Sequence, residues 1–171
     1  MRSAGMAEAM ERGEIDLAVG YFPDLDTKGF HSQSLAMEPL ICIARSDHPS
    51  VGDTIDMETF ERVPQAVVSH EERAQHAYEK LIVDQRILRN IRARIAHFTS
   101  VPVVIAATDL IAVVPRDLAE LYSEMATFKL KQVGLPFALP PLELKQYWHQ
   151  RTHRDPASRW LRSVITALYK E

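Results

Sequence analysis

Along the chain, segments in which every second residue is hydrophobic, as in a strand, alternate with segments in which hydrophobic residues recur every three to four positions, as in a helix. Ile15, Leu17 and Val19 are separated by polar or small residues, which predicts a short buried strand over 15–20. Gly13 and Gly20 flank this strand, and glycine is the residue that most easily takes the conformations of helix ends and sharp turns. Similar patterns predict further strands over 30–37, 40–44, 66–68, 91–98, 110–114, 128–133 and 142–148.

Segments with helical spacing of apolar residues separate these strands. They predict a helix capped by Thr54, a helix opened by Pro115, and others over 3–12, 71–83 and 100–107. A last helix over 156–169 has Asp155 as its N-cap and Pro156 in its first turn. We expect its apolar stripe to pack on the domain; the stripe consists of Trp160, Leu161, Val164, Ile165 and Leu168. Short strands separated by helices are typical of an α/β domain with a mixed sheet.

Composition and charge narrow the class of protein. The chain has 171 residues, 46% of them hydrophobic and 25% charged, which fits one globular domain or two small lobes. A net charge of −3 argues against a nucleic-acid-binding surface, which needs a basic face. The single cysteine, Cys42, lies in an apolar run, so we expect it in the core of a cytoplasmic protein. We find no membrane span and no secretory signal.

The motifs of common enzymes are missing from the sequence. It contains no glycine-rich phosphate loop, no G-x-S-x-G and no H-E-x-x-H. His149 and His153 are four residues apart, but they span a strand end and a turn, so we do not expect a helical pair of metal ligands. The sequence therefore predicts no enzyme, no metal and no cofactor.

One segment does suggest a binding site, where the strand that ends near Phe98 meets the helix that starts at Thr99 or Ser100. Backbone N–H groups at a helix start favour an anion, and His97 and the two hydroxyls add donors. The Phe98 ring offers an aromatic wall, so the segment suits a small aromatic carboxylate. The alternative is that Ser100 is an ordinary cap, Phe98 a core residue and His97 a half-buried histidine.

Several motifs follow one another in a characteristic order. The sequence Gly-Glu-Ile-Asp-Leu-Ala-Val-Gly (13–20), Glu38-Pro39-Leu40, Asp47-His48-Pro49 and Thr-Asp-Leu-Ile-Ala-Val-Val-Pro (108–115) resembles the effector-binding domain of LysR-type bacterial transcriptional regulators. Further segments resemble the branch that regulates aromatic degradation and nodulation; they are 97–98, 147–149, 154–156 and 160–162.

The resemblance implies a two-lobed α/β fold like that of the periplasmic binding proteins, with an incomplete first lobe. Lobe I would comprise 1–37 and 152–171, and lobe II 38–151. A small effector, aromatic and anionic, would bind in the cleft between the lobes. Its ligand-binding residues would be His97, Phe98, Thr99 and Ser100, with Phe22, Pro23, Leu135 and Pro136 nearby.

The resemblance also implies partners. A complete regulator of this type carries a winged helix-turn-helix, which is absent from this sequence, so promoter DNA would be bound only through that missing domain. The effector domain is expected to form a homodimer or tetramer. An extracytoplasmic solute-binding protein of the same fold is the alternative, and the lack of a secretory signal counts against it.

Overall fold

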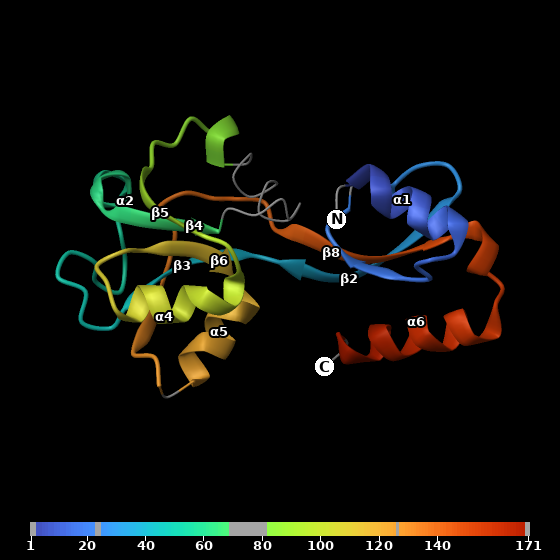
Figure 1. Ribbon diagram of the computed structural model, residues 1–171. Helices are drawn as coiled ribbons and strands as arrows, with labels where there is room; N and C mark the ends of the chain where they lie inside the picture. Colours follow the sequence, from blue (N-terminus) through green and yellow to red (C-terminus); the bar gives the residue numbers. More distant parts are fainter. Residues whose placement is uncertain (1–2, 23–24, 69–81, 126, 170–171) are drawn as a thin grey trace. The chain divides into compact units, whose positions relative to one another are not determined.

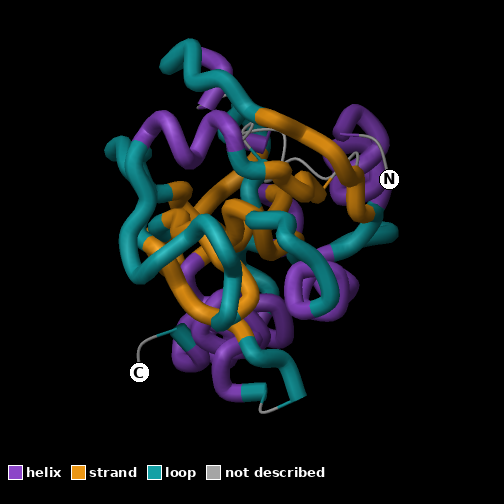
Figure 2. Tube along the Cα trace, turned by 90° about the vertical axis from the view of Figure 1, so that its left-hand side faces the viewer, coloured by secondary structure: helices purple, strands orange, loops and turns teal. Residues whose placement is uncertain are grey.

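The computed structural model describes residues 3–22, 25–68, 82–125 and 127–169. The chain divides into two compact units, Met1–Met37 with Leu142–Glu171, and Glu38–Pro141. The chain returns to the first unit at Leu142, ten residues before the expected boundary at 151/152. The reason is that strand β8 (Leu142–His149) pairs within the first unit. Figures 1 and 2 allow the alternation of helices and strands to be followed along the chain.

Unit 1 contains a sheet in the order β1-β8-β2, where β1 is Ala18–Gly20 and β2 is Phe30–Glu38. Strand β1 runs antiparallel to β8, with Ala18 opposite Tyr147. It is shorter than the predicted 15–20, because the N–H groups of Glu14 and Ile15 donate to the Ala9 carbonyl and hold this segment against helix α1 (Ser3–Arg12). The core of the unit consists of Met10, Ala18, Leu25 and Tyr147.

Helix α6 (Pro156–Leu168) begins as predicted but turns an unexpected face inward. The Asp155 carboxylate accepts from the Ser158 N–H at 2.7 Å, and Pro156 opens the first turn. The buried side chains, however, are Ser158 and Arg162, whereas Trp160 is 66% exposed and Leu168 is 70% exposed. The prediction that the apolar stripe faces the core is therefore wrong for these residues. The reason is that Arg162 finds polar and aromatic partners on the inner face.

Unit 2 contains a mixed sheet, as predicted. Strand β3 pairs antiparallel with β6 and β7, and β4 pairs parallel with β5. A parallel bridge between Gln65 and Ile111 connects the two groups of strands. The strands are β3 (Leu40–Arg45), β4 (Pro64–Val68), β5 (Asn90–Ile95), β6 (Ala112–Pro115) and β7 (Leu130–Val133). The helices are α2 (Met57–Arg62), α4 (Val101–Ala106) and α5 (Arg116–Glu124).

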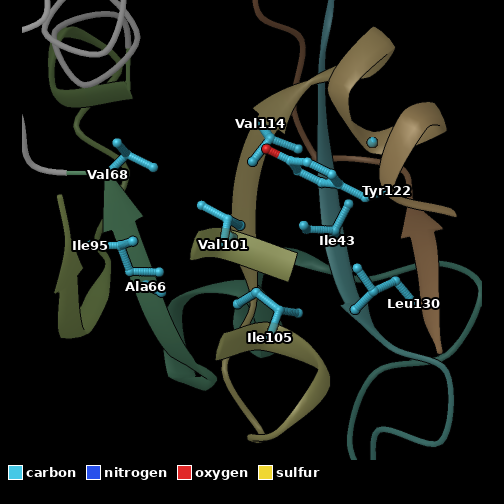
Figure 3. Packing of buried hydrophobic residues seen from close by; sticks show 11 residues of the cluster. Ile43, Ala66, Val68, Ile95, Val101, Ile105, Val114, Tyr122 and Leu130 are labelled. Carbon is cyan, nitrogen blue, oxygen red and sulfur yellow. The ribbon is translucent and has the colours of Figure 1, made fainter. Parts of the chain in front are cut away.

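Side chains that alternate along β3 divide the core of unit 2 between the two faces of the sheet. Ile43 packs with Val101 and Ile105 of α4 and with residues of α5 (Figure 3). Cys42 points to the other face, where it packs in the cluster that contains Phe60 of α2. Cys42 is fully buried, which confirms its expected place in the core, and burial raises the pKa of its thiol to about 12.

Helix α2 begins at Met57, because the Asp56 carboxylate rather than Thr54 caps it, accepting from the Thr59 N–H at 2.7 Å. Ile55 is buried but lies outside the helix. Most of the helix predicted over 71–83 falls outside the described residues, and only its last part, at Ile82 and Val83, is seen to be helical.

Candidate functional site

The predicted site residues follow the carboxyl end of strand β5. Strands β4 and β5 are parallel, so their carboxyl ends lie at the same edge of the sheet, which is where open α/β sheets bind ligands. After the buried Ile95 the chain continues through His97 into a 3₁₀ turn, η2 (Phe98–Ser100), and then into α4. Pro102 suits the first turn of α4, because an N–H group at that position would have no hydrogen-bond partner within the helix.

The start of this helix differs from the expected one. The Ser100 N–H donates to the His97 carbonyl at 3.1 Å, and the Val101 N–H donates to the Phe98 carbonyl. The N–H groups of Phe98 and Thr99 donate to none of the described residues. An anion would therefore meet these two groups rather than the Ser100 N–H. Helix α4 has six residues, so the anion would be held by these local donors more than by a helix dipole.

The side chains of the segment divide between core and surface. His97, Thr99 and Ser100 are exposed, and the Ser100 hydroxyl makes no capping bond to α4. Phe98 is half-buried and packs against the cluster of Figure 3, and its carbonyl accepts from the Tyr122 hydroxyl at 2.8 Å. His97, Thr99 and Ser100 are thus exposed polar residues that flank Phe98 in sequence, and the Phe98 side chain is anchored in the core.

The other predicted site residues lie elsewhere. Phe22 belongs to unit 1, where its ring meets Tyr147 edge-on at 5.8 Å between centroids. Pro23 lies outside the described residues. Leu135 is half-buried and packs with the cluster that contains Cys42, on the opposite face of the sheet from Phe98. Pro136 follows it and is also half-buried.

A polar network connects two motifs of the sequence, Asp47-His48-Pro49 and the segment 108–115. Arg45 at the end of β3 forms ion pairs with Asp47 and with Asp109, the latter at 2.6 Å. His48 is 8% exposed, and its Nδ1 accepts from the Ser50 N–H at 3.1 Å. Its Nε2 therefore carries the proton and donates to the Asp109 carbonyl at 3.1 Å. Both motifs thus tie the turn after β3 to the loop before β6, so their role here is structural.

A pair of neighbouring carboxyl groups, those of Glu38 and Asp117, was not predicted from the sequence. Glu38 is the first residue of unit 2. Burial raises the pKa of Glu38, and the neighbouring Asp117 carboxylate raises it further. Asp117 is in the first turn of α5, and the Arg116 N–H next to it donates to the Pro39 carbonyl at 2.9 Å. No local pattern could have indicated this pair, because its members are far apart in the sequence.

Comparison with known proteins identifies the family. The model of the LysR substrate-binding domain matches residues 1–170. The chain belongs to this family. It is 32% identical to the transcriptional activator NahR of Pseudomonas putida over 99% of its length and 55% of that protein. It is 30% identical to the activator NagR of a Ralstonia species, again over 99% of the chain and 55% of the relative.

Solved structures agree with this assignment to the LysR substrate-binding domain. A probable transcriptional regulator from Pseudomonas aeruginosa superposes with a TM-score of 0.82 at 25% identity, over 94% of this chain and 52% of that one. The chain spans about half the length of the curated relatives it matches. In the described part of this LysR domain, no helix is long and apolar enough to cross a membrane. The same residues contain no group of three side chains suited to hold a metal.

Proposed function

We propose that this LysR substrate-binding domain senses a small aromatic anion at residues 97–100 and thereby controls a transcriptional regulator. The observation that carries the proposal is the set of exposed donors at the carboxyl end of β5, beside the half-buried Phe98 ring. The anionic group would accept from His97, from the hydroxyls of Thr99 and Ser100, and from the N–H groups that open η2. The aromatic part would pack on Phe98.

The rest of the function follows from the family and is part of the same proposal. The ligand would lie in the cleft between two lobes, with Phe22, Pro23, Leu135 and Pro136 on its borders. Promoter DNA would be bound through a separate helix-turn-helix domain, and this domain would form a homodimer or tetramer in the cytoplasm. The relatives are transcriptional regulators, which supports a sensor without catalytic activity and disfavours an extracytoplasmic solute-binding protein.

A titration with benzoate as probe tests the site. A hydrogen bond to a charged group contributes about 1.5–3 kcal/mol, so His97→Ala should weaken benzoate binding by about tenfold to a hundredfold. Thr127→Val, an exposed threonine elsewhere in unit 2, should leave the affinity unchanged. Calorimetry measures the affinities, and circular dichroism checks that the variants are folded. Equal affinity in the wild type and in His97→Ala would exclude this residue from the site.

A further inference from the structure

Unit 1 contains a cavity of about 370 Å³, largely open to solvent, between strand β2 and helix α6. This volume is at the lower end of the range for small-molecule sites. Gln33 lines it from β2, and the other lining residues come from one side of α6: Arg159, Arg162, Ser163, Thr166 and Ala167. Two of these side chains are cationic and none is acidic. The cavity shares no residue with the site at 97–100.

The charge of Arg162 is buried without a carboxylate in direct contact among the described residues. The side chain is 8% exposed and forms no ion pair with a carboxylate among the described residues. Its guanidinium donates to the Ser158 hydroxyl at 2.6 Å and to the His153 carbonyl at 3.0 Å, and lies 4.4 Å from the centre of the Trp148 ring. Buried arginines are usually paired with an acid, so the positive charge of Arg162 lacks the usual carboxylate partner in the described part of the chain, although its N–H groups are engaged.

Arg159 adds to this positive charge from the same face of the helix, three residues earlier. The pKa of Arg162 is lowered first by burial and then by the charge of Arg159. Asp155 is the carboxylate that opposes this effect, and it already caps α6 by accepting from the Ser158 N–H at 2.7 Å. The two guanidinium groups therefore repel each other at the cavity, and a bound anion would relieve that repulsion.

The wall on the β2 side is held in place by a buried amide. Gln146 of β8 is fully buried, and its Nε2 donates to the Gln33 Oε1 at 2.8 Å and to the Thr166 hydroxyl at 2.9 Å. The amide oxygen of Gln33 is thus engaged, so the group it can offer to a ligand is its NH₂. Thr166 donates its own hydroxyl proton to the Arg162 carbonyl at 2.8 Å. The cavity consequently presents cationic and amide donors.

We propose that this cavity is a second ligand site, which binds a small oxyanion of the phosphate type, either free or carried by a compact metabolite. Arg159 and the Gln33 amide hold the oxygens, and the buried charge of Arg162 attracts the anion. Planar, charge-assisted donors of this kind are the groups that recognise phosphate in proteins. The site is distinct from the proposed effector site, because the two share no residue.

The test is a calorimetric titration of the whole chain with inorganic phosphate, at an ionic strength held constant with sodium chloride. We expect saturable binding to the wild type that is at least tenfold weaker in Arg159→Gln. Arg159 is exposed, so this variant keeps the buried contacts of Arg162. Arg154→Gln, an exposed arginine of unit 1 that does not line the cavity, is the matched control and should bind as the wild type does.

A parallel titration with glycerol phosphate distinguishes the two sources of the oxyanion. Tighter binding of glycerol phosphate supports a phosphorylated metabolite, and tighter binding of inorganic phosphate supports the free ion. If neither compound binds, or if Arg159→Gln binds phosphate as tightly as the wild type, the inference is overturned. Benzoate titration of the same proteins keeps this result separate from the proposed function, because Arg159→Gln should not alter benzoate affinity.

Discussion

The exposed stripe of α6 yields a sharp prediction about stability. Complete burial of a tryptophan would make its replacement by alanine cost about 3–5 kcal/mol of unfolding free energy. Trp160 is 66% exposed, so about a third of its surface is buried. Trp160→Ala should therefore cost about 1–2 kcal/mol of unfolding free energy. Alanine is also the best helix former, which reduces the cost further. If the stripe faced the core, as the sequence alone suggests, the larger figure would apply.

Urea unfolding followed by circular dichroism measures this cost. Met10→Ala is the control, because Met10 is fully buried in the same unit and its truncation should cost about 2–5 kcal/mol. The measurement is repeated at two protein concentrations, since self-association through the stripe would bury Trp160. A loss of 3 kcal/mol or more for Trp160→Ala at both concentrations would refute the orientation of α6 described above.

Two further predictions concern ionisable groups. Cys42 should not react with Ellman's reagent in the folded protein at pH 8, because it is fully buried and its pKa is about 12; rapid reaction without urea would contradict its place in the core. The pKa of Glu38 is raised in the folded protein. As the pH rises above about 4.5, Glu38 therefore keeps its proton longer in the folded protein than in the unfolded one. This difference lowers the free energy of unfolding towards neutral pH. Glu38→Gln should therefore be more stable than the wild type at pH 7 but not at pH 4, as measured by urea unfolding. An equal difference in stability at the two pH values would refute the raised pKa of Glu38.

Local signals in the sequence determined much of the secondary structure. The end of α1 follows from Gly13, and the start of α6 follows from Asp155 and Pro156. These residues act on the backbone only a few positions away. The alternation around Cys42 indicated a buried strand, because neighbouring side chains of a strand point to opposite faces. The order of the motifs also indicated the LysR family. These are properties of short segments.

The tertiary structure decided which faces and residues meet. The apolar residues of α6 were evident, but the choice of its inner face depended on the Trp148 ring and on the His153 carbonyl, which together hold Arg162. The proximity of Glu38 to Asp117, and of Gln33 to Arg159, joins residues that are distant in sequence, so no periodicity could indicate it. Charge and hydrogen bonding between such residues depend on distances that only the packed chain defines, and the proposed oxyanion site of unit 1 rests on those distances.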